Sequence, residues 1–111
     1  MELKGHRAKA ERLDRSVEKL KNEADFEIII EGCYAASVQY LALICDRRVR
    51  RHLDTHKGLT KFLDENDLGD LAAFFRELEL LRTSKYYGGQ RNGKSAKEAK
   101  RILAEIKTKL H

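Results

Sequence analysis

The absence of proline is the feature that most constrains how this chain can fold. None of its 111 residues is Pro, the residue that most strongly ends or kinks a helix. Hydrophobic residues make up 41% of the chain, which is enough for one core but, at this length, too little for two. We therefore expect a single all-helical domain that spans residues 1–111.

The spacing of apolar residues divides the first half of the chain into two helices. Residues 4–23 carry apolar side chains at steps of three and four between mainly charged ones, which predicts an outer helix. Residues 25–48 are apolar nearly all round, which predicts a central helix that a second subunit could also cover. Gly32, Ala35 and Ala36 in this segment would let a neighbouring helix approach closely.

A short helix and a longer one are expected next. The short helix should begin near Thr55, with Thr55 or Asp54 as its N-cap. Asn66 or Asp67 would cap the longer helix, which should end within residues 84–87, just before two glycines.

The last helix is predicted from a capping box. Ser95 is followed three residues later by Glu98, the spacing at which the two side chains cap each other's backbone amides. The apolar stripe of this helix consists of Ala99, Ile102, Leu103, Ile106 and Leu110. The expected architecture is an all-α, up-and-down bundle of four long helices plus one short helix.

The cysteines and the chain's apolar segments indicate a cytoplasmic protein. Cys33 and Cys45 would lie roughly 18 Å apart on one helix, too far for a disulfide, so we interpret them as buried thiols. No metal-binding spacing is present, and neither a metal nor a cofactor is expected. The N-terminus lacks a signal-peptide core, and residues 33–45, the longest apolar stretch, are too few to span a bilayer.

Three short motifs stand in order along the chain. They are Tyr34-Ala35-Ala36, His56-Lys57-Gly58-Leu59, and Leu81-Arg82 followed by Tyr86-Tyr87-Gly88. The motifs and their order resemble those of the HEPN domains, small helical bundles that often accompany nucleotidyltransferases or act as ribonucleases. The resemblance implies a HEPN-like bundle, and we expect it to be a homodimer that acts as a non-catalytic binding or adaptor module. Its partner would be a small nucleotidyltransferase, or a nucleotide or RNA bound in a basic groove.

One departure from the family pattern bears on activity. The ribonuclease members carry a His shortly after the Arg, whereas here Tyr87 follows Arg82. Tyrosine titrates near pH 10, which makes Tyr87 a poor general base. One alternative is a toxin-type, metal-independent ribonuclease with an atypical Arg/Tyr/His site, which His52, His56 or His6 would complete. The other is a purely structural, dimerising bundle.

Candidate site residues fall into two groups. The resemblance and the tyrosine-glycine loop point to ligand or phosphate contacts from Arg82, Tyr86, Tyr87, His56, Lys57 and Tyr34. The densest positive charge would give electrostatic support through Arg47, Arg48, Arg50, Arg51 and His52. Arginines at this point could instead complement the dipole of a helix C-terminus. Arg82 could instead pair with Asp70, Glu77 or Glu79. The net charge of +5 permits a polyanionic partner without requiring one.

Overall fold

The computed structural model describes residues 2–51, 58–87 and 93–110, with the backbone alone for residues 84–87. Most of these residues are in α-helices. The helices are α1 (Leu3–Glu18), α2 (Phe26–Val49), α3 (Leu59–Glu65), α4 (Gly69–Tyr87) and α5 (Gly93–Thr108). No strand occurs within these ranges. The predicted all-α bundle of four long helices and one short helix is therefore confirmed.

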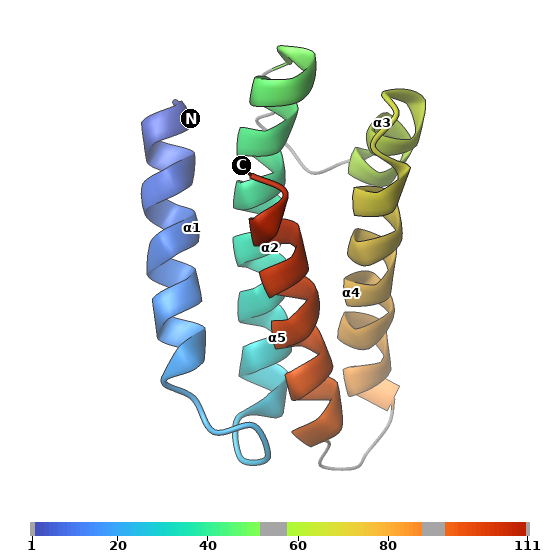
Figure 1. The fold of residues 1–111 in the computed structure, drawn as a ribbon. Helices are drawn as coiled ribbons and strands as arrows, with labels where there is room; N and C mark the ends of the chain where they lie inside the picture. The colour runs from blue at the N-terminus through green and yellow to red at the C-terminus, as the bar shows by residue number, and fades with distance from the viewer. Residues whose placement is uncertain (1, 52–57, 88–92, 111) are drawn as a thin grey trace.

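The central helix is α2, against which α1, α4 and α5 all pack (Figure 1). α3 packs against α4, and α4 also packs against α5. Successive long helices run in opposite directions (Figure 1). The start of α1, the end of α2 and the C-terminus therefore lie at one end of the bundle, while the start of α2 and the end of α4 lie at the other.

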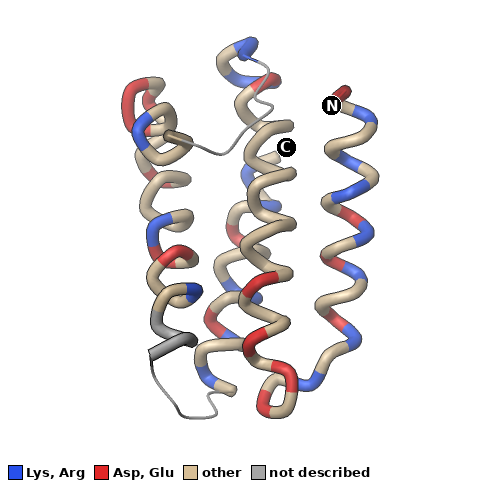
Figure 2. Tube along the Cα trace, turned by 180° about the vertical axis from the view of Figure 1, so that it is seen from behind, with Lys and Arg blue, Asp and Glu red and all other residues tan. Residues whose placement is uncertain are grey.

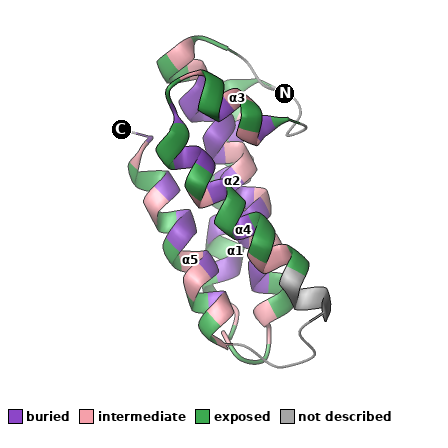
Figure 3. Ribbon diagram, turned by 90° about the vertical axis from the view of Figure 1, so that its right-hand side faces the viewer, coloured by how far each residue is buried: buried purple, intermediate pink, exposed green. Residues whose placement is uncertain are grey.

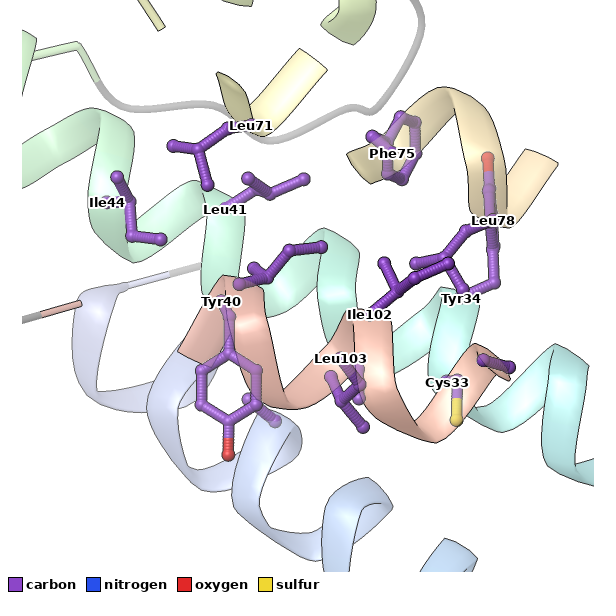
Figure 4. Close-up of a cluster of buried hydrophobic side chains, with 14 of the residues drawn as sticks. Cys33, Tyr34, Tyr40, Leu41, Ile44, Leu71, Phe75, Leu78, Ile102 and Leu103 are labelled. Atoms are coloured by element: carbon purple, nitrogen blue, oxygen red, sulfur yellow. The ribbon is translucent and has the colours of Figure 1, made fainter. Parts of the chain in front are cut away.

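The core runs along the inward faces of the helices, where buried residues face one another (Figure 3). Residues of α2, α4 and α5 meet in its middle (Figure 4): Tyr34, Leu41, Ile44, Leu71, Phe75, Leu78, Ile102 and Leu103. The predicted apolar stripe of the last helix is buried over its whole length, including Leu110 just beyond the helix end. Apolar burial of this extent is the main favourable term that holds such a bundle together.

A close contact between α1 and α2 depends on a glycine. A Cβ atom built on Gly32 would lie only 2.5 Å from Cγ2 of Val17, closer than two carbon atoms can approach. Ala36, one turn further along α2, is fully buried. The prediction that small residues in this segment allow a neighbouring helix to approach closely is confirmed for Gly32, and α1 is that helix.

A polar network links α1 to α2 and α5. The buried carboxylate of Asp14 accepts hydrogen bonds from the Tyr40 hydroxyl at 3.0 Å and from the Lys107 ammonium at 2.9 Å. Tyr40 projects toward α1 in Figure 4. The hydrogen bond to Asp14 raises the pKa of Lys107 above its usual value. Burial, reinforced by the charge of Asp14, raises the pKa of Tyr40.

The ends of the first and third helices differ from the prediction. α1 ends at Glu18 rather than near residue 23, so Ala24 lies outside the helix and is exposed. α3 begins at Leu59, after Gly58, whose backbone φ of +73° is in the left-handed region that favours glycine. This start is later than predicted, and the predicted N-caps Asp54 and Thr55 lie outside the described residues.

The remaining caps also differ. Asn66 ends α3, where its side-chain amide donates to the Phe62 carbonyl at 2.8 Å, and α4 begins three residues later at Gly69. α5 begins at Gly93, so Ser95 is the third residue of the helix rather than its N-cap. Side chains of Asn and Ser bond to several nearby backbone groups, so sequence identifies such residues more easily than their exact role.

The helix α2 is longer than the apolar stretch within it. Its 24 residues include a window with a mean hydropathy of 1.6, so it is long and apolar enough to cross a membrane by length and composition. Of that window, 67% is buried inside the bundle. This burial is what the core helix of a soluble protein shows, and the fold is compatible with a soluble protein.

One face of α2 remains partly open. Ile28 is 62% exposed, and Ala35 and Val38, farther along the same face, are half-buried. The homodimer expected from the sequence would cover this face, and it stays a prediction.

Candidate functional site

Two of the predicted site residues meet at the interface of α2 and α4. The guanidinium of Arg82 lies over the Tyr34 ring, 4.4 Å from its centroid. The Tyr34 ring stacks in turn on Phe75, with 5.1 Å between the centroids. The three side chains form a layered stack, which we call the Arg82 stack (Tyr34, Phe75 and Arg82). Burial raises the pKa of Tyr34, with the carboxylate of Glu79 adding to the rise and Arg82 opposing it.

The charge of Arg82 is balanced by Glu31 on α2. The Nε atom of Arg82 donates to both carboxylate oxygens of Glu31, at 3.0 and 3.1 Å. The sequence offered Asp70, Glu77 or Glu79 as structural partners, all on α4, but the partner in this pair lies fifty-one residues away in the chain. An arginine held by a carboxylate and a ring has much of its charge and one face already engaged.

The structure describes the other residues of the first predicted group only in part. Tyr86 and Tyr87 form the end of α4, as predicted, through their backbone alone. His56 and Lys57 lie outside the described residues, as does His52 of the second group. Their contribution to a site stays a prediction.

Two of the clustered arginines cap the end of α5. Arg47 Nη1 donates to the Leu110 carbonyl at 2.7 Å, and Arg48 Nη2 donates to the Lys109 carbonyl at 2.8 Å. These carbonyls follow the last turn of a helix and have no amide partner within it, so guanidinium donors satisfy them and complement the helix dipole. Both arginines also lie in the last turn of α2, as expected, so the structural alternative accounts for part of this cluster at the ends of two helices.

The next two arginines have different roles. Arg50 is the C-cap of α2, in a left-handed backbone conformation with a φ of 56°, and its side chain is exposed. The Arg51 guanidinium lies 5.7 Å from the centroid of the Phe62 ring on α3.

The Arg82 stack and the arginine cluster do not form one site. Arg82 binds Glu31 near the start of α2, and Arg47 follows sixteen residues later on the same helix. At 1.5 Å per residue, about 24 Å of helix separates them. Figure 2 shows the same separation, with Lys and Arg segments near the end of α2 and Glu segments near its start.

A groove of about 570 Å³ lies at the end of the bundle where α1 begins and α2 ends. Four basic side chains, one carboxylate and three leucines line it: Lys4, Arg7, Arg47, Arg50, Asp46, Leu3, Leu43 and Leu110. We call it the end groove. It combines two of the predicted arginines with Lys4 and Arg7, which were not among the predicted site residues.

The cations of the end groove are largely unneutralised. Within the described ranges, no ion pair or side-chain hydrogen bond involves Lys4, Arg7 or Arg50. Arg47 uses one of its five N–H donors on the Leu110 carbonyl, which leaves others for a ligand. Several cations around one concave surface, without partner carboxylates, attract anionic groups.

A sequence signal for Lys4 and Arg7 did exist. The connection between the first two predicted helices is short, and helices joined in this way run antiparallel side by side. The start of the first helix then falls beside the end of the second, and both ends are basic. The signal was the coincidence of two basic helix ends rather than any local motif.

The described histidine and cysteines are part of the core. His6 is buried between α1 and α2, with its Nδ1 atom 2.6 Å from Gln39 Oε1. Cys33 and Cys45 are buried free thiols, as expected, and burial raises their pKa values to about 12 and about 11. Neither thiol is a nucleophile at neutral pH. No group of three metal-ligating side chains occurs in the part of the chain that the structure describes.

In comparisons with known proteins, no family model, curated protein or solved structure matches this chain.

Proposed function

We propose that this chain is a HEPN-like, non-catalytic binding module of the cytoplasm that holds the phosphates of a nucleotide or RNA in the end groove. The observation that carries the proposal is the set of cations around that groove without ion-pair partners. Phosphate groups are the anions that such a set fits best, because each guanidinium can donate two parallel hydrogen bonds to one phosphate.

The meeting of Tyr34 and Arg82 supports the HEPN-like part of the proposal. The resemblance singled out both residues from motifs that lie far apart in the chain, and their side chains stack at 4.4 Å. A chance likeness of short motifs would not explain why these two distant residues contact each other. The Glu31 carboxylate balances Arg82, so we place the ligand in the end groove and give the Arg82 stack a structural role.

The chemistry of the groove supports binding rather than catalysis. Its described lining contains cations, one carboxylate and leucines, but no histidine. Ribonuclease chemistry without a metal needs a group that exchanges a proton with the ribose 2′-hydroxyl near neutral pH. The one described histidine, His6, is enclosed in the core. The toxin-type ribonuclease is therefore the alternative outcome of the test below.

The test is the binding of fluorescently labelled single-stranded RNA, followed by anisotropy at low and moderate salt. The double variant R7Q/R50Q removes two exposed groove charges and keeps long polar side chains. We expect its affinity to fall by about tenfold or more, since each lost phosphate contact removes on the order of 1 kcal/mol. Wild-type binding should weaken as salt rises.

The matched control is the double variant R12Q/R15Q. Both arginines are exposed on α1, one to two turns beyond Arg7, and their loss changes the net charge by the same amount. Affinity within about twofold of wild type is expected, because total charge alone contributes little at moderate salt. Equal losses in both doubles, or no RNA binding by the wild type, would refute the proposal. RNA cleaved on a gel would support the ribonuclease, and capture of a nucleotidyltransferase without RNA binding would support an adaptor.

A further inference from the structure

The end groove contains one acidic side chain among its cations. Asp46 lines the groove beside Arg47 and Arg50. In the described chain, its carboxylate takes part in no ion pair and no side-chain hydrogen bond. A lone carboxylate in a groove that attracts phosphates weakens their binding by repulsion, unless the ligand also donates a hydrogen bond to the carboxylate.

The local structure does not explain this acid. Asp46 lies in the last turn of α2, where the helix dipole disfavours a negative charge. Arg50 stands four residues later, the usual position for an ion pair on a helix. Its left-handed backbone, with a φ of 56°, removes it from the regular helical position. The Asp46 carboxylate is therefore left without a partner in the groove.

An ionised carboxylate can only accept hydrogen bonds. A ligand that suits both Asp46 and the surrounding cations must carry anionic groups and a hydroxyl or amine donor close to them. In RNA the 2′-hydroxyl is such a donor, on the ribose carbon next to the one that carries the 3′-phosphodiester, and DNA lacks it. Cations hold the phosphate on either backbone, so the carboxylate is the group that can distinguish the two.

We propose that Asp46 makes the end groove selective for ribonucleotides, by accepting a hydrogen bond from a ribose hydroxyl while the neighbouring cations hold the phosphates. This inference rests on the proposed function of the groove and specifies its ligand further. Asp46 is a specificity-determining residue in this scheme: it weakens phosphate binding in general and offsets that loss only for ribose.

The experiment compares oligouridylate with oligodeoxyuridylate of the same length, labelled at the same end. The two probes carry the same base and differ only in the 2′-hydroxyl. We expect the wild type to bind the ribose probe about fivefold to tenfold more tightly, as one hydrogen bond to a charged group in a partly open groove provides. In D46A the affinity for the deoxyribose probe should rise, and the ratio should fall toward one.

The control variant is E27A. Glu27 is an exposed acid at the opposite end of α2, so its removal changes the net charge as D46A does but leaves the groove intact. The ratio between the two probes should stay at its wild-type value in E27A. D46N, whose amide oxygen still accepts a hydrogen bond, should keep part of the preference.

The outcomes separate this inference from the proposed function. If the wild type binds both probes equally and R7Q/R50Q loses both, the groove binds phosphates and the role of Asp46 is wrong. A ribose preference that persists in D46A also overturns the inference. Failure of the wild type to bind either probe overturns the inference and the proposed function together.

Discussion

The Arg82 stack and the end groove are two basic regions of this bundle that differ in what their cations contact. Arg82 has a carboxylate at 3.0 Å on one side and an aromatic ring at 4.4 Å on the other. In the described structure, Lys4, Arg7 and Arg50 of the end groove have neither. The charge of Arg82, which belongs to a predicted motif, is thus largely neutralised. The cations of the end groove, which belong to no motif, remain available to a ligand.

The difference shows that an arginine's surroundings inform on function more than its place in a motif. A guanidinium that a carboxylate already neutralises must share its charge with that partner when an anionic ligand binds, and this cost is subtracted from the affinity. An unpaired one at a concave surface offers its charge at no such cost. Each prediction below changes a contact on the paired side, where stability should change and RNA binding should not.

The largest effect is expected at Tyr34, the middle layer of the Arg82 stack. Its ring is buried between Phe75 and Arg82, so Tyr34→Ala should lower the free energy of unfolding by about 3–5 kcal/mol. Tyr34→Phe keeps the ring and should cost only about 1 kcal/mol. Urea unfolding followed by circular dichroism measures both. A small loss in Tyr34→Ala would mean that the stack adds little to the core.

A smaller effect is expected at Asp14, which holds another paired cation, Lys107. Asp14→Ala removes the acceptor of two hydrogen bonds and should cost about 1.5–3 kcal/mol. Glu11→Ala removes an exposed acid from the same helix and should stay within about 0.5 kcal/mol of wild type.

The same network predicts a dependence of stability on pH. The pKa values of Lys107 and Tyr40 are raised in the folded state. As pH rises, the unfolded chain therefore loses the protons of these two groups before the folded protein does. Their contribution is complete below about pH 10, near the unfolded pKa values, and is lost as pH rises through the folded ones. The free energy of unfolding should therefore fall above about pH 10. An equally steep fall in Asp14→Ala would exclude Lys107 as a source.

The smallest effect is expected at Arg82, where the two regions are compared most directly. Its ion pair with Glu31 is about 40% exposed on both sides, and Arg82→Ala should cost about 1 kcal/mol or less. RNA affinity should stay within about twofold of wild type, in contrast to R7Q/R50Q. Loss of RNA binding in a folded Arg82→Ala variant would move the site from the end groove to the Arg82 stack.

Sequence reasoning predicted the helices better than their ends and better than the site. The central helix was expected over residues 25–48 and occupies Phe26–Val49, because an uninterrupted apolar run leaves few other solutions. The short helix begins at Leu59 rather than near residue 55, because Gly58 adopts a left-handed backbone and precedes its first turn. The pairing of Arg82 was missed because its partner lies on another helix.

The sequence by itself determined the all-helical class, the five helices of the described residues and the buried stripe of the last helix, since these follow from local spacing and from the absence of proline. Only the tertiary structure decided which cations are neutralised. Glu31 and Arg82 are fifty-one residues apart, and Arg47 and Leu110 are sixty-three apart. The end groove likewise exists only where the start of α1, the end of α2 and the residue Leu110 come together. Charge balance depends on distance in space, and only the packing of the helices sets that distance.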